Sequence, residues 1–133
     1  MGTISANIKK RPKFISLTDV INAEDFRLMF GDFLHLFKIN ENRYEMIKAP
    51  PIPRGESFDR EKLCTLAAAA HKLSNDYGYP VPEWVHDSYY VMPDPVFAFN
   101  TSSKEYQEFL LKDTPHEYAM RNLYTGSNVL QAV

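Results

Sequence analysis

Residues 59–78 read DREKLCTLAAAAHKLSNDYG, and this stretch decides the fold. Ser57 or Asp59 can cap the start of a helix, and Gly78 suits the left-handed residue that closes one. The four consecutive alanines at 67–70 have high helix propensity and a slim surface, which lets another helix approach closely. We therefore expect a central helix that runs to about Tyr77.

Two further helix signals precede this stretch. Ser16 and Asp19 are spaced as in a capping box, which predicts a helix start. Residues 24–38 carry apolar side chains at steps of three and four, which is typical of an amphipathic helix. Gly31 inside that helix costs about 1 kcal/mol relative to alanine, so we expect another helix to contact it closely. The apolar positions are Phe26, Met29, Phe30, Phe33, Leu34 and Phe37.

Shorter elements follow the central helix. Residues 96–99 alternate too briefly to predict more than one strand-like piece, and 102–113 read as a helix. The segment 114–117, TPHE, has the cap, the proline and the acid of a helix start. The last helix is expected to carry Leu123 and to end at Gly126.

These elements predict a mainly α protein, a compact bundle of about four to five helices with proline-rich connectors and at most a short β-like segment. At 133 residues the chain is expected to form one domain. We expect residues 1–13 to be a basic flexible arm and 14–133 a single helical domain. The proline-rich connector 49–57 lies inside that domain because each flanking piece is too short to bury its own core.

Composition and charge narrow the classes of function. The single cysteine, Cys64, excludes a disulfide framework within one chain, and no apolar run predicts a leader or a membrane span, so we expect a cytoplasmic protein without membrane partners. The net charge is −2, and taking away the four cations of the arm leaves −6 for residues 14–133. Such a body fits a basic protein groove better than DNA phosphates. The arm cations are Lys9, Lys10, Arg11 and Lys13.

No motif of catalysis or cofactor binding stands out. The four histidines lack the spacing of a shared metal site, and Cys64 has no cysteine partner. His86 beside Asp87 offers a base and a carboxylate, but neighbours in sequence seldom face one another. The five glycines form no phosphate-binding loop. We therefore predict no catalytic, metal or cofactor residues and no cofactor.

Four residues are candidates for a partner-binding surface: Trp84, Asp87, Arg121 and Asn122. Interfaces are rich in Trp, Tyr and Arg, which favours a surface role. The structural alternative is that Arg121 stacks on or pairs with Trp84, Asp87 or Glu83, and that Asn122 closes a helix. Sequence leaves both readings open.

The order of these motifs resembles a small bacterial family of uncharacterised proteins over about residues 57–133. The family pattern has an alanine-rich helix, a Pro-x-Pro-x-Trp-Val step, a Ser/Thr-Pro-x-x-Phe turn and an Arg-Asn-Leu-Phe ending. Members often lie beside a nucleotidyltransferase-like protein in toxin–antitoxin-like or defence-associated settings on mobile DNA. The resembling segments here are 71–78, 80–87, 114–118, 121–124 and 128–130.

The resemblance implies a non-enzymatic, antitoxin-like domain that binds and masks a cognate protein, which could be a nucleotidyltransferase-like toxin. One alternative is a DNA-associated regulator that uses the arm cations Lys9, Lys10, Arg11 and Lys13. A second alternative is an enzyme that uses His86 or His116.

Overall fold

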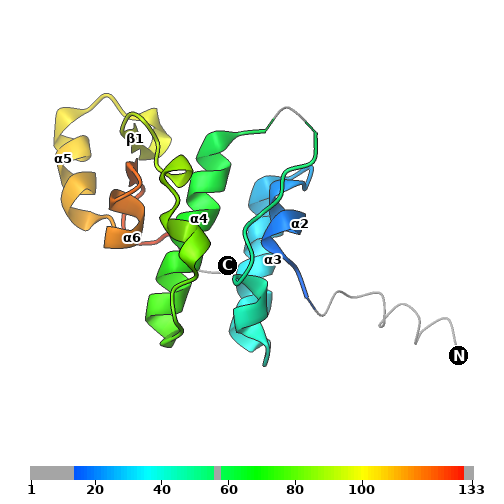
Figure 1. The fold of residues 1–133 in the computed structure, drawn as a ribbon. Helices are drawn as coiled ribbons and strands as arrows, with labels where there is room; N and C mark the ends of the chain where they lie inside the picture. The colour runs from blue at the N-terminus through cyan, green and yellow to red at the C-terminus, as the bar shows by residue number, and fades with distance from the viewer. Residues whose placement is uncertain (1–13, 56–57, 131–133) are drawn as a thin grey trace, which may run out of the picture.

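The computed structural model describes residues 14–55 and 58–130. Its long central helix, α4, separates two groups of elements: α2 and α3 lie on one side, and β1, α5 and α6 lie on the other (Figure 1). The predicted basic arm, with Lys9, Lys10, Arg11 and Lys13, lies outside the described residues. The fold is mainly helical with one short sheet, so the predicted fold class is confirmed.

The first helical pair follows its local sequence signals. Helix α2 (Leu17–Ile21) begins at Ser16, whose hydroxyl accepts from the Asp19 amide at 3.1 Å while the Asp19 carboxylate accepts from the Ser16 amide at 2.9 Å. This reciprocal pair is the predicted capping box. Helix α3 (Phe26–Ile39) is capped by the Asp25 side chain, and its inner face buries Phe33, Leu34 and Phe37.

Gly31 does not have the predicted helix neighbour. Apart from its chain neighbours and the backbone of its own helix, a methyl group at this position would meet no atom of the described chain within 4 Å. Gly31 lies toward the solvent side of α3, whereas the buried phenylalanines lie on the opposite side. The expectation of a close contact within the described chain was wrong because the other helices pack on the face of α3 that carries these phenylalanines.

The connector after α3 is held by two side chains from α2 and its end. A 3-10 turn, η1 (Arg43–Met46), leads into extended chain that includes Ile52. The Ile52 amide donates to Thr18 Oγ1 at 3.0 Å, and Asn22 Nδ2 donates to the Ile52 carbonyl at 2.9 Å. The Arg54 amide donates to Asn22 Oδ1 at 2.7 Å. These side chains satisfy backbone groups that the proline-rich segment cannot pair within a helix or sheet.

Helix α4 (Arg60–Tyr77) is covered on two sides. Its start is capped by the Asp59 side chain, and Gly78 closes it with φ 74°, as predicted. The four alanines at 67–70 are each 0% exposed. Two buried clusters share this helix: Ala67 and Ala70 belong to the core with α2 and α3, and Ala68 belongs to a second core that includes Tyr118 and Leu123.

The chain after α4 consists of short elements. The two strands pair in parallel, with Val96 opposite Leu123 and Phe97 opposite Tyr124. Of the strand-like piece predicted at 96–99, only Val96–Phe97 is a strand, and Ala98 and Phe99 belong to the 3-10 turn that follows it. The elements are η2 (Glu83–His86), η3 (Ser88–Tyr90), β1 (Val96–Phe97), η4 (Ala98–Asn100), α5 (Lys104–Asp113), α6 (His116–Ala119) and β2 (Leu123–Tyr124).

Two predictions about the end of the fold were wrong. The Thr114 hydroxyl caps no helix; it accepts a hydrogen bond from the Gly126 amide at 2.9 Å. The last helix ends at Ala119, and Leu123 lies in β2. Asn122 between them has φ 62°, a left-handed conformation that asparagine tolerates better than most residues. The pairing of β2 with β1 and the left-handed turn at Asn122 therefore decide the structure here, although the sequence pattern favours a longer helix.

Candidate functional site

The structure places Arg121 inside the fold, where its side chain is 1% exposed. Its Nη1 donates to the Glu117 carbonyl at 2.7 Å, and its Nη2 donates to the Val85 carbonyl at 2.7 Å. Nη1 also lies 3.2 Å from His71 Nδ1. Arg121 therefore links α6 and η2 to α4 and is not available on the predicted partner-binding surface.

The short α6 and the turn after it explain why Arg121 points inward. Because α6 ends at Ala119 and Asn122 is left-handed, the chain reverses beside α4. Asn122 Nδ2 donates to the Met92 carbonyl at 2.7 Å, which fixes this turn to the chain before β1. Asn122 is therefore engaged in the fold as well. The alternative pairing of Arg121 with Trp84, Asp87 or Glu83 is not what the structure shows.

Trp84 and Asp87 lie nearer the surface. Trp84 is half-buried, its Nε1 donates to the Ile47 carbonyl at 3.1 Å, and its ring meets Tyr90 edge-on at 5.3 Å. Asp87 is exposed, and its carboxylate accepts from the Tyr89 amide at 2.9 Å. The four predicted residues thus do not form one continuous surface: two hold the interior, one is half-buried and Asp87 is exposed.

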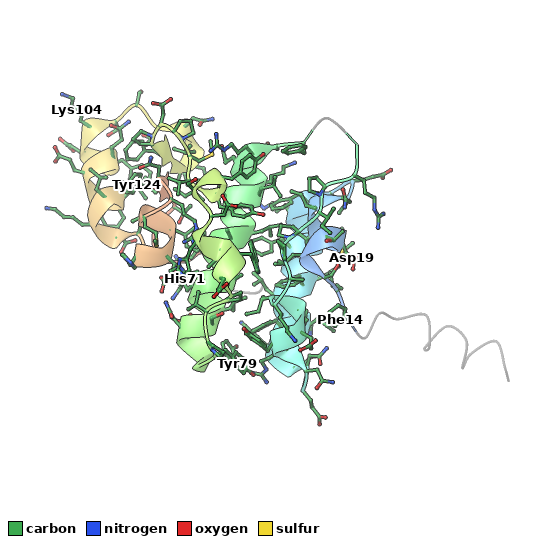
Figure 2. All side chains as sticks on the ribbon, viewed as in Figure 1. Phe14, Asp19, His71, Tyr79, Lys104 and Tyr124 are labelled. Atoms are coloured by element: carbon green, nitrogen blue, oxygen red, sulfur yellow. The ribbon has the colours of Figure 1, made fainter. Side chains whose placement is uncertain are left out.

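His71 and Arg121 form a buried contact between two basic groups. His71 lies on the side of α4 toward α6 (Figure 2). Since a guanidinium can only donate, His71 Nδ1 must accept, which requires the neutral imidazole with its proton on Nε2. Burial lowers the pKa of His71, the charge of Arg121 lowers it further, and Glu117 opposes both effects. The nearby His86 and His116 also lower this pKa.

The free energy of unfolding is therefore expected to decrease as the pH is lowered through the titration of His71. Because its pKa is lowered in the folded state, His71 binds a proton more readily in the unfolded chain, so stability is lost as the pH falls below 6.5. Replacement His71→Gln keeps an acceptor for Arg121 but cannot titrate. We expect urea unfolding to lose less stability in this variant than in the parent between about pH 7.5 and 5.5.

The control variant is Leu111→Gln, which introduces the same side chain at an exposed position of α5 and removes no titratable group. It should keep the pH dependence of the parent, and a parent-like slope in His71→Gln would contradict the assignment.

The carboxyl group of Glu117 affects stability at a lower pH than His71 does. Burial favours a higher pKa for its carboxyl, but the hydrogen bond from Asn75 Nδ2 at 2.8 Å helps to bring the pKa below 4.5.

Within residues 14–55 and 58–130, no group of three or more His, Cys, Asp or Glu side chains could hold a metal ion. His86 is exposed and its ring packs edge-on to His71 at 5.3 Å, while His116 is the first residue of α6. Cys64 is buried, and its burial raises the pKa of the thiol. In the described part of the chain, the Cys64 thiol donates to the Tyr89 carbonyl, with 3.9 Å between sulfur and oxygen.

One exposed loop stands out, which sequence reasoning missed. Phe99 has φ 59° and the next residue, Asn100, has φ 50°, so two consecutive residues adopt the left-handed conformation. The Phe99 side chain is 91% exposed. An open depression of about 210 Å³ lies beside it. The depression is lined by residues of α4, β1, η4 and β2, with Thr125, among them Glu61, Thr65, Phe97 and Leu123.

Comparisons with models of protein families, with curated proteins and with solved structures find no match for this chain. Among the described residues, no helix is both long and apolar enough to cross a membrane.

Proposed function

We propose that the chain is an antitoxin-like protein-binding domain that contacts a cognate protein through the loop 98–101, which we call the Phe99 loop. The observation that carries this proposal is the Phe99 ring, 91% exposed on a left-handed backbone. A large aromatic side chain that is exposed to solvent gains the free energy of apolar burial only when a partner covers it. Buried aromatic side chains are frequent anchors of protein interfaces.

The surrounding loop holds Phe99 in this conformation. The Thr101 amide donates to the Ala98 carbonyl at 3.3 Å, and Gln107 Nε2 from α5 donates to the Thr101 carbonyl at 2.9 Å. A left-handed phenylalanine costs on the order of 1–2 kcal/mol, so such strain persists only where neighbouring contacts fix it. Strained backbone of this kind is typical of binding and active sites. An anchor that is ordered in advance reduces the entropy lost on binding.

Charge and resemblance define the kind of partner. Residues 14–133 carry a formal charge of −6, which favours a basic surface on the partner. Asp87 remains an exposed candidate contact. The resembling family lies beside nucleotidyltransferase-like proteins, so the product of the adjacent gene is the first partner to test.

We expect replacement Phe99→Gly to weaken partner binding by at least about tenfold, because it removes the anchor ring. The same change relieves the left-handed strain, so the free domain should unfold with a free energy that is equal or up to about 1 kcal/mol higher. Binding is measured by titrating the product of the adjacent gene, and stability by urea unfolding. A loss of binding with no loss of stability separates an anchor from a structural residue.

The matched control is Phe109→Ala on α5, which removes another exposed phenylalanine, 54% exposed, outside the loop. This variant should bind as the parent does. Separate elution of the two proteins after co-expression, with no relief of toxicity, would overturn the proposed function. Equal losses of binding in both variants would instead exclude Phe99 as a specific anchor.

A further inference from the structure

The outer face of α3 carries a regularly spaced set of exposed residues that take no part in the core. Five exposed residues follow one another at steps of three, four, three and four. This spacing places them along one stripe of the helix, as in the seam of a coiled coil. Two of them are large and apolar, and Leu28 and Ile39 are each 64% exposed. The stripe consists of Asp25, Leu28, Asp32, His35 and Ile39, and we call it the α3 stripe.

Gly31 lies beside the middle of the α3 stripe and leaves room above the helix. An open depression of about 600 Å³ covers this face, and Leu28, Gly31, Asp32 and His35 contribute to its lining. A glycine in the middle of a helix costs stability, about 1 kcal/mol relative to alanine. Within the described chain no contact compensates for this cost. Close approach of a second helix would do so, because glycine lets two backbones come near.

We infer that the α3 stripe binds a second copy of this chain, with the two α3 helices antiparallel. A two-fold axis midway between Asp32 and His35 sets Asp32 of each copy opposite His35 of the other. The same axis sets Leu28 of each copy opposite Ile39 of the other. The interface then has two inner layers, each of which pairs a carboxylate with an imidazole, and two outer apolar layers, so one stripe is complementary to itself.

The parallel arrangement is disfavoured by the same residues. A parallel pair sets Asp32 against Asp32, which brings two carboxylates together in the middle of the stripe and leaves His35 with no carboxylate opposite it. The helix dipoles also oppose a parallel pair, whereas antiparallel helices align them favourably. The order of the carboxylate and the imidazole along the α3 stripe therefore selects the antiparallel pair.

The position of α3 makes this contact independent of the Phe99 loop. Helix α3 lies on the opposite side of α4 from β1 and α5 (Figure 1). A single helix face buries less area than a standard stable interface, so we expect a weak dimer that forms in the micromolar range or above. Such a dimer leaves both Phe99 loops open, and a failure of one proposal does not imply failure of the other.

Disulfide trapping tests the antiparallel register. The double variant Leu28→Cys with Ile39→Cys is expected to form covalent dimers under mild oxidation, because the two positions oppose one another across the axis. Leu28→Cys alone should form few, since the two copies of residue 28 are eleven helical positions apart, about 16 Å. The native Cys64 is buried and does not compete. Efficient trapping by the single variant, or none by the double variant, would overturn the antiparallel pairing.

Charge exchange tests the inner layers without cysteines. His35→Asp sets two carboxylates against each other, and we expect the dimer to weaken by at least about tenfold in sedimentation velocity. The double variant Asp32→His with His35→Asp restores the pairing of a carboxylate with an imidazole and should restore association. Leu111→Lys on α5, where the parent leucine is 50% exposed, should leave association unchanged. A parent chain that stays monomeric at millimolar concentration would refute the inference.

Discussion

Replacement Arg121→Ala is expected to lower the free energy of unfolding by about 3–4 kcal/mol, the largest effect of any change considered for this chain. The alanine leaves a cavity between α4 and α6, and it removes the donors to the carbonyls of Glu117 and Val85, both at 2.7 Å. Urea unfolding followed by circular dichroism measures the change.

Replacement Arg121→Met separates the packing role from the hydrogen bonds. Methionine keeps much of the side-chain volume and removes a buried charge that forms no ion pair within the described residues. We expect a loss of about 1–2 kcal/mol, which is smaller than the loss for alanine because the cavity is filled. If alanine and methionine both cost less than about 1 kcal/mol, Arg121 does not hold α6 and η2 to α4.

The second large effect is expected for Ala68→Leu, at about 2–3 kcal/mol of lost stability. Ala68 is 0% exposed and lies in the buried cluster with Cys64, Tyr118 and Leu123. Leucine adds three carbon atoms where neighbouring elements already contact the helix, so the backbones must move apart. The midpoint of urea unfolding should fall accordingly, although leucine has nearly the same helix propensity as alanine.

The matched control for this change is Glu108→Leu, which introduces the same side chain at an exposed position of α5. It should alter stability by less than about 0.5 kcal/mol. A similar small effect for Ala68→Leu would show that the alanines are not needed for close packing around α4.

The parts of the fold that sequence predicts well depend on local chemistry. Ser16, Asp59 and Gly78 define helix ends because their side chains or backbone freedom act within a few residues. The same holds for α3, whose buried face follows from the spacing of its phenylalanines. The alanines of α4 identified the central helix for the same reason.

The wrong predictions fall where contacts between residues far apart in the sequence determine the structure. Thr114 has a good capping pattern, yet its hydroxyl bonds the Gly126 amide, twelve residues away. Leu123 continues a helical pattern, yet the strand at Val96 pairs with it. Neither partner is visible in the local sequence, so periodicity alone favoured helices at both places.

The candidate site was predicted only in part. Arg121 was expected on a partner-binding surface or paired with Trp84, Asp87 or Glu83, yet it is buried with other partners. Residue type alone does not show whether a side chain points inward or outward. Phe99 was read as part of a strand-like piece, and a positive φ at phenylalanine has no sequence signal of the glycine or asparagine kind. Only Asn100, the next residue, hinted at a left-handed turn.

The alanine surface of α4 has a consequence during synthesis of the chain. Arg121 follows His71 by 50 residues, so at about 5–20 residues per second the ribosome adds it roughly 3–10 s later. During that interval the face of α4 that carries Cys64 and Ala68 is not yet covered by α6 and β2. An alanine exposes little apolar area, so a nascent helix of this kind offers other chains little to adhere to. The small side chains that permit tight packing in the finished protein thus also limit aggregation while it is being made.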